Sequence, residues 1–169
     1  METERRYDTK HGCVTLRPER PEDDAFLFAL FCSHAGRALR QAALPEVAFE
    51  TMMGFQYRSQ TGTHHAMFPD ALYSIIESEG APIGRLIEAD EGDTVYFVDF
   101  ALLPERQAQG LGTAFIIQVS DEWARKGKAA RVEVLKSNLH SLKLCAKVGL
   151  IQYADLGNGY VGLKRAIPG

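Results

Sequence analysis

The 169-residue sequence lacks several features that would assign a protein to a broad class before any motif is considered. It has no excess of charge of one sign, because 19 lysine and arginine residues oppose 22 acidic residues and leave a formal net charge of −3. A broad basic surface is therefore not expected, and we predict neither nucleic acid nor an anionic membrane as a partner. No apolar run approaches the length of a membrane span, and residues 1–6 lack the apolar core of a signal peptide.

Cysteine is also scarce. Cys13, Cys32 and Cys145 are odd in number and show no C-x-x-C spacing, which favours reduced thiols and a cytoplasmic location. Internal repeats, low-complexity tracts and long linkers are absent as well. With 46% hydrophobic and 24% charged residues, the composition is that of an ordinary soluble globular protein. We predict a loose polar tail at residues 1–12, followed by a single domain over residues 13–169.

Among the features that the sequence does contain, residues 94–128 are the most informative stretch. Residues 94–103 are nearly all β-branched, aromatic or aliphatic, which is typical of a strand buried on both faces of a sheet. Pro104 ends this run, because proline cannot donate a hydrogen bond to a strand ladder. A glycine turn follows at residues 107–113, and a helical pattern continues over residues 113–126. The stretch therefore predicts a unit of strand, glycine turn and helix.

Glycines at the start of a helix let the backbone approach a ligand, and the unpaired N–H groups there favour a phosphate. Two well-known glycine motifs do not fit this turn. The dinucleotide pattern G-x-G-x-x-G fails because Phe115 occupies the third glycine position, and no Gly-Lys-Ser/Thr of a nucleoside-triphosphate loop follows. A nicotinamide-binding enzyme is therefore disfavoured. The pattern that fits is Q/R-x-x-G-x-G/A, as Gln107-x-x-Gly110-x-Gly112.

The rest of the chain alternates between strand and helix signals. Strands are expected at residues 13–17, 71–77, 83–88, 94–103, 130–135, 150–153 and 160–163. Helices are expected after the acidic start at residues 17–24, over residues 46–60, over residues 113–126, and between Asn138 and Gly149. In the last of these helices, Ser137 or Asn138 can cap the N-terminus. Its expected inward-facing residues are Leu139, Leu142, Cys145 and Ala146.

Residues 33–69 are the hardest segment to interpret. The apolar residues of the helix over 46–60 are expected in the core, namely Val47, Phe49, Met52, Met53 and Phe55. The adjacent pair His64 and His65 invites a metal site, but neighbouring side chains diverge and no second ligand pattern accompanies them. No metal site is therefore expected. We assign both histidines to a loop, either at the surface or lining an acceptor pocket.

The glycine turn and a second pattern together resemble a known family. Gln107-x-x-Gly110-x-Gly112 is similar to the acyl-CoA pyrophosphate loop of the GNAT acyltransferases, the large N-acetyltransferase superfamily. Residues 138–150, N-x-x-S-x-x-L-C-x-K-x-G-L, are similar to that family's N-x-x-A-x-x-L-Y-x-K-x-G-F. Residues 101–105 look like the end of its fourth strand, and the order of elements from residue 13 to residue 165 is the family's order.

The resemblance implies an α/β (α+β) fold of the GNAT type. Such a fold has a mixed, mostly antiparallel central sheet of six to seven strands, flanked by about four helices. Its strands four and five are parallel and splay apart to admit the pantetheine arm of the coenzyme. The residues implied in coenzyme binding are Ala101, Leu102, Leu103, Gln107, Ala108, Gln109, Gly110, Leu111, Gly112, Thr113, Asn138, Ser141, Leu144 and Lys147.

The resemblance also implies an acyl-CoA-dependent N-acetyltransferase. It would transfer the acetyl group of acetyl-CoA to a primary amine of a small molecule or a protein, by direct attack in a ternary complex. Acetyl-CoA and an amine acceptor are then the expected partners, no metal is expected, and a homodimer is compatible with the sequence. The alternative is an acyl-CoA-binding sensor or partner module with little catalysis, because the tyrosine of the second motif is missing.

Amide formation from a thioester needs a neutral amine and a stabilised oxyanion. As the resemblance implies, backbone N–H groups near Leu102 would polarise the carbonyl. Two carboxylates are candidate bases. Glu133 lies on the fifth strand of the family order, where some related enzymes carry a glutamate base, and Asp99 is a lone acid inside a very apolar strand. Glu133 is slightly favoured.

The departing thiolate also needs a proton, and the family's usual donor is the tyrosine that Cys145 replaces. The thiol could serve as the acid, or form a covalent acyl-cysteine, or simply fill the core of its helix. We favour the filler role. Tyr153, Tyr160 or water would then supply the proton.

Overall fold

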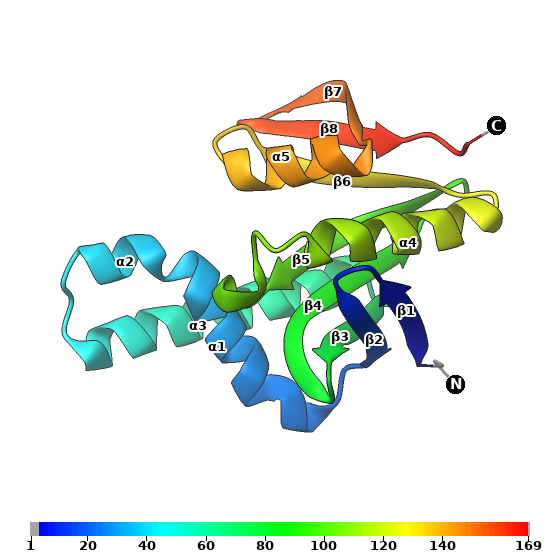
Figure 1. Cartoon of the computed structure of the whole chain (residues 1–169). Coiled ribbons are helices and arrows are strands. Elements are labelled where there is room, and N and C mark those ends of the chain that lie inside the picture. Colours follow the sequence, from blue (N-terminus) through cyan, green and yellow to red (C-terminus); the bar gives the residue numbers. More distant parts are fainter. Residues whose placement is uncertain (1–3, 169) are drawn as a thin grey trace.

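The computed structural model of the chain describes residues 4–168, except the side chain of Ala38, and contains one sheet with strand order β1-β2-β3-β4-β5-β6-β8-β7 (Figure 1). The strands are β1 (Arg5–Thr9), β2 (Gly12–Pro18), β3 (Leu72–Ser78), β4 (Ala81–Asp90), β5 (Thr94–Leu102), β6 (Ala129–Leu135), β7 (Ile151–Gly157) and β8 (Tyr160–Arg165). The helices are α1 (Asp24–Ala35), α2 (Arg37–Gln41), α3 (Glu46–Met67), α4 (Leu111–Arg125) and α5 (Leu139–Val148), with short 3₁₀ turns η1 (Pro21–Asp23) and η2 (Pro104–Arg106).

All neighbouring strands of this sheet are antiparallel except β5 and β6, which are parallel and are joined by α4. A parallel pair requires such a crossover, because a tight turn can join only antiparallel strands. The mixed, mostly antiparallel sheet predicted from the sequence is confirmed. It has eight strands rather than six to seven, and the described residues form five α-helices rather than about four.

Helices cover both faces of the sheet. The largest apolar cluster packs α4 and α5 onto one face, with Ile76 of β3 among its members. Two smaller clusters lie on the opposite face, beneath α1 and α3, and one of them contains Ile75. Successive residues of a strand point to opposite faces, so Ile75 and Ile76 mark the two sides of the same strand. The sheet is therefore buried from both sides along its centre.

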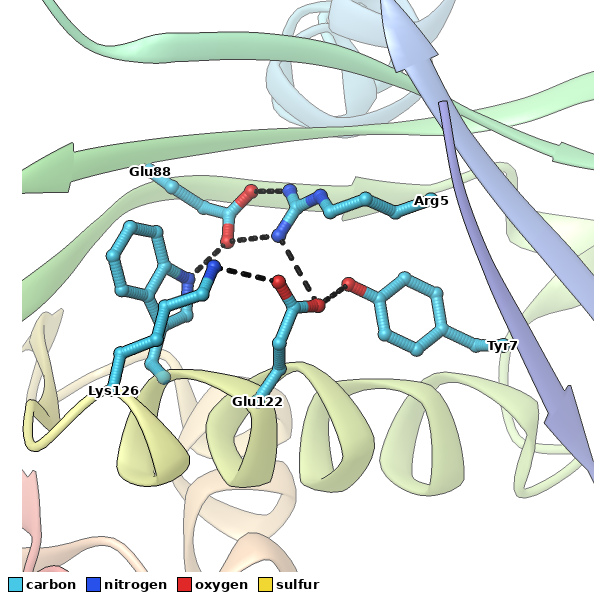
Figure 2. Close-up of polar contacts among 6 residues, drawn as sticks. Arg5, Tyr7, Glu88, Glu122 and Lys126 are labelled. Carbon is cyan, nitrogen blue, oxygen red and sulfur yellow. Dashed lines mark hydrogen bonds and ion pairs between the residues drawn. The ribbon is translucent and has the colours of Figure 1, made fainter. Parts of the chain in front are cut away.

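β1 forms where a loose N-terminal tail is expected. Its Tyr7 is buried and packs edge-on against Phe115 of α4, with 5.3 Å between the ring centroids. Arg5 pairs with the buried carboxylate of Glu88 on β4 and approaches Glu122 of α4, to which Tyr7 donates a hydrogen bond of 2.5 Å (Figure 2). The expectation of a loose segment is wrong because the charges of β1 find partners that are remote in sequence.

α3 is longer than the predicted helix, and its buried face is narrower. Phe49 and Met53 are buried as predicted. Val47 and Phe55 are instead 76% and 70% exposed, and Met52 is exposed too, so their predicted place in the core is wrong. A helix that lies on a sheet buries one stripe with a spacing of three to four residues, and these three side chains lie outside that stripe.

Two other placements differ from the sequence-based expectation. His64 and His65 lie in the last turn of α3 rather than in a loop. On α5, Cys145 is buried as predicted, whereas Leu139 and Ala146 are exposed. The physical reason is the same as for α3, because α5 also buries a single narrow stripe against its neighbours.

Candidate functional site

The sheet opens between β5 and β6. These two strands pair only from Thr94 with Ala129 to Tyr96 with Arg131. Beyond this level, β5 continues along β4 as far as Leu102, whereas β6 follows β8. The second half of β5 is therefore unpaired on one edge and only partly buried, although full burial on both faces is expected from its composition. The predicted splay of the two parallel strands is confirmed.

The end of β5 turns backbone groups toward this opening. The register with β4 shifts so that Val98 is an extra residue of β5, a bulge that bends the strand. Further along, the Leu103 N–H donates to the Ile83 carbonyl of β4 at 2.8 Å. Because successive residues direct their N–H and C=O groups to opposite edges, those of Leu102 lie on the edge that faces the opening.

Two side chains contact the Leu102 carbonyl oxygen. Gln107 donates its Nε2 hydrogen at 2.8 Å, which ties the glycine turn to the strand end. His34 Nε2 of α1 lies 2.8 Å from the same oxygen. Sequence analysis gives His34 no role, since a single histidine in a helix carries no pattern that would reveal this contact. α1 and the glycine turn therefore meet at one backbone carbonyl.

The glycine turn presents the N-terminus of α4 at this opening. Gly110 is the N-cap with a φ of 80°, a region that favours glycine, and no side chain of residues 4–168 caps the helix. Its carbonyl accepts the first intrahelical hydrogen bond, from Ala114, so the N–H groups of residues 111–113 have no intrahelical acceptor. Gly112 is so close to β5 that a Cβ would lie 3.0 Å from Leu102 Cδ1. This geometry suits an anionic group.

Ala108 and Gln109 complete the turn. Ala108 has a positive φ of 58°, and Gln109 Nε2 donates to the Glu105 carbonyl at 2.9 Å. His11 lies against the same turn, because a Cβ built on Gly110 would be 2.7 Å from His11 Nε2. Sequence analysis misses His11, since this contact exists only because β1 and β2 join the sheet and place their connecting turn here.

The second motif lies on α5, which packs beside α4 (Figure 1). Asn138 caps α5 as predicted, and its Oδ1 accepts a hydrogen bond of 3.1 Å from the Ser141 N–H. Ser141 and Leu144 are half-buried, and Lys147 is exposed. The asparagine thus has a structural role, while donor binding by these residues stays a prediction.

Cys145 lies in the core between α5 and the sheet, and it is only 5% exposed. Burial raises the pKa of its thiol to about 11. The thiol is therefore protonated near neutral pH, whereas a reactive cysteine needs a lowered pKa and an accessible sulfur. These surroundings favour a packing role for Cys145.

The two candidate bases border the opening on opposite strands. Asp99 of β5 accepts hydrogen bonds from Arg85, at 3.0 Å from Nε and 2.6 Å from a terminal guanidinium nitrogen. Glu133 of β6 is exposed and accepts a hydrogen bond of 2.8 Å from Arg131. Continuing the β5–β6 register past its last pair places Glu133 opposite Val98, next to Asp99. Both carboxylates are thus near the opening, and each is already ion-paired.

Two hollows lie at the side of the molecule that α1, α2 and α3 form. One of about 440 Å³ is lined by Cys32, Ser33, Arg37, Arg40, Gln41 and Pro104. The other, of about 320 Å³, is lined by Glu19, Arg20, Pro21, Asp24, His65 and Tyr73. Within residues 4–168, no three metal-binding side chains come together, and no helix is both long and apolar enough to cross a bilayer.

The sequence model of the acetyltransferase (GNAT) family matches residues 38–150, which is more than half of the chain. Among solved structures, the PaiA N-acetyltransferase from Thermoplasma acidophilum in complex with coenzyme A is 15% identical, with a TM-score of 0.66 over 90% of this chain and 98% of its own. The ribosomal-protein-S18-alanine N-acetyltransferase from Escherichia coli is 17% identical and has a TM-score of 0.63; the match covers 91% of this chain and 94% of that protein. Mycobacterium smegmatis RimJ in complex with CoA-disulfide is 17% identical and has a TM-score of 0.62; the match covers 97% of this chain and 87% of that protein. At these identities the likeness concerns the fold. No protein of curated function matches the chain in sequence.

Proposed function

Because the chain belongs to the acetyltransferase (GNAT) family, we propose that it transfers the acetyl group of acetyl-CoA to a primary amine, by direct attack of the amine in a ternary complex. Acyl transfer is the activity of the family, and the amine acceptor and direct attack are the finer proposal. One observation supports acetyl-CoA as the donor. The uncapped N-terminus of α4 lies on the glycine turn at the open end of β5, where a phosphate and a thioester arm can be bound together.

In this proposal, the coenzyme lies along the opening between β5 and β6. The N–H groups of residues 111–113 and the positive end of the α4 dipole bind its pyrophosphate, and His11 adds an imidazole beside them. The pantetheine arm lies along the open edge of β5 that ends near Leu102, and α5 lines the other side. The coenzyme A held by the similar PaiA structure supports a donor of this chemistry.

The chain supplies candidates for each chemical requirement. The N–H of Leu102 faces the opening and would stabilise the oxyanion. Glu133 is proposed as the base ahead of Asp99, because Glu133 is exposed and can pass its proton to water, whereas Asp99 is held by the largely buried Arg85. The leaving thiolate would take its proton from water or a tyrosine rather than from the buried Cys145.

The test combines thermal stabilisation by acetyl-CoA with coenzyme A release over a panel of primary amines. A ligand that binds only the folded state raises the melting temperature. Gly110→Asp places a side chain and a negative charge at the proposed pyrophosphate site, so both signals should be lost. Gly127→Asp is the matched control, because Gly127 has a similar φ of 77° and nothing within 4 Å of its added Cβ.

Each outcome decides between specific alternatives. Stabilisation and thiol release that Gly110→Asp abolishes and Gly127→Asp preserves would support the proposed function. Stabilisation without thiol release from any amine would favour the acyl-CoA-binding sensor. A folded Gly110→Asp variant with the coenzyme affinity of the wild type would overturn the phosphate assignment.

A further inference from the structure

The contact between His34 and the Leu102 carbonyl has no part in the function proposed above. His34 Nε2 lies 2.8 Å from the carbonyl oxygen, and Gln107 Nε2 donates to the same oxygen at 2.8 Å. A carbonyl oxygen can only accept hydrogen bonds, so His34 must carry a proton on Nε2 and act as the second donor. The oxygen has two lone pairs. Both are therefore occupied by side chains of this chain.

The two donors come from segments on opposite faces of the sheet. His34 belongs to α1, whose apolar residues pack on one face, whereas Gln107 lies in the turn that leads into α4 on the other face. The neighbouring strand cannot bind this carbonyl, because β5 and β6 pair only as far as Tyr96. An open strand edge otherwise leaves its carbonyl groups to water or to a new partner. Here α1 and the glycine turn satisfy the carbonyl in place of a strand.

The state of this carbonyl affects the N–H of the same residue. The N–H and C=O of one extended residue point to the same edge of a sheet, so both groups of Leu102 face the opening. In the proposed function, the N–H stabilises the oxyanion that forms when the amine attacks. A free carbonyl beside it would oppose that charge, because the negative end of its dipole faces the same region. Two N–H donors on the carbonyl oxygen offset this negative end and fix the peptide before the reaction begins.

We infer that His34 is a positioning residue for acyl transfer, which binds the Leu102 carbonyl so that Leu102 offers only its N–H to the acyl oxygen. This inference rests on the proposed function. His34 is exposed, so removing its imidazole takes away one donor without opening the core. The acyl oxygen carries its negative charge in the transition state and not in the bound thioester. The loss of His34 should therefore affect the rate more than the binding of the coenzyme.

The experiment measures kcat for coenzyme A release, the affinity for free coenzyme A and the melting temperature in variants of α1. His34→Ala should lower kcat about three- to tenfold, the range of one hydrogen bond, and leave the other two quantities unchanged. His34→Gln should restore most of the lost rate, because glutamine also ends in an N–H donor but cannot act as a base. Ser33→Ala is the matched control and should keep the wild-type rate, since the Ser33 hydroxyl donates to the Leu30 carbonyl of its own helix at 2.6 Å.

Three results would overturn the inference. The first is an unchanged kcat in His34→Ala. The second is a His34→Gln variant as slow as His34→Ala, because the imidazole would then serve as a base. The third is a loss of melting temperature or of coenzyme A affinity that accounts for the loss of rate, because His34 would then only support the fold or the coenzyme site.

A binding comparison separates these results from failure of the proposed function. S-ethyl-coenzyme A has nearly the shape of acetyl-CoA but lacks the acyl oxygen. If no amine releases coenzyme A, calorimetric titration with these two ligands decides the case. A preference of the wild type for acetyl-CoA that His34→Ala loses, and that His34→Gln and Ser33→Ala keep, would support the role of His34. Equal affinity of the wild type for the two ligands would overturn it, and so would a preference that survives His34→Ala.

Discussion

Cys145 shows how one residue can depart from a family motif while keeping its place in the structure. The motif resemblance puts a tyrosine at this position, whereas the cysteine found here is buried in the core. We therefore expect Cys145→Ala to lower the free energy of unfolding by about 1–2 kcal/mol through lost packing. Turnover should stay within a few fold, as measured by kcat for coenzyme A release.

A catalytic role of the Cys145 thiol would give a different result. A large loss of kcat in Cys145→Ala, with coenzyme affinity unchanged, would mean that the thiol is used in the transition state. Trapping a radiolabelled acetyl group on Cys145 with acetyl-CoA alone would indicate a covalent route and contradict the packing role. Cys145→Tyr adds a further comparison, since a faster tyrosine variant would mean that the natural protein works with a weaker acid.

The choice between the two carboxylates at the opening can be decided by separating rate from stability. Glu133→Gln should reduce kcat about 100-fold, if Glu133 is the base. Its melting temperature should change little, because the exposed pair with Arg131 contributes little to stability. Asp99→Asn should instead destabilise the fold, since it takes the charge partner from the largely buried Arg85. An active Glu133→Gln variant would transfer the role of base to Asp99.

At the scale of elements, β1 is held by an ion pair of Arg5 as well as by the buried ring of Tyr7. The side chain of Glu88 is fully buried, and its carboxylate accepts hydrogen bonds from Arg5 of β1 and from Trp123 Nε1, the latter at 2.6 Å (Figure 2). Arg5→Ala should lower the free energy of unfolding by about 3–5 kcal/mol in urea titrations, because it leaves a buried carboxylate without its counter-ion. Arg6→Ala is the control, and its exposed pair with Asp8 should cost less than about 1 kcal/mol.

A second variant tests the cause of that loss. Arg5→Ala combined with Glu88→Gln removes the buried charge together with its partner, while the amide oxygen can still accept from Trp123. The double variant should therefore be more stable than Arg5→Ala alone. Equal stability of Arg5→Ala and Arg6→Ala would show that β1 is held by the packing of Tyr7 and not by the ion pair.

At the scale of the molecule, the elements that follow from local chemistry could be predicted. The strand, glycine turn and helix over residues 94–126 depend on proline, on glycine and on apolar periodicity, all of which are visible in sequence. The unpredicted features depend on contacts between remote segments. β1 is mostly charged, and its pattern becomes meaningful only beside Glu88. His11 and His34 reach the site through packing, and periodicity alone cannot say which stripe of α3 meets the sheet.

Stability in acid is a property of the whole charge distribution. Ion partners hold the pKa of Asp23, Asp90 and Glu91 below its usual range, chiefly through hydrogen bonds from Arg17, Lys128 and Arg131 respectively. The folded protein therefore binds fewer protons than the unfolded chain in acid. The contribution of these three carboxylates to stability should be constant above the unfolded pKa of about 4 and should fall as the pH drops through the lowered folded values. Urea midpoints between about pH 7 and pH 3 measure this slope.

Glu19 has the opposite sign, because burial raises its pKa in the folded state. Its contribution is most favourable below the unfolded pKa of about 4, where both states are protonated, and becomes a penalty as the pH rises through the folded pKa. Glu19→Gln should therefore raise the urea midpoint near neutral pH and leave it unchanged near pH 3. A loss of stability near neutral pH would mean instead that Glu19 has a partner in the folded protein.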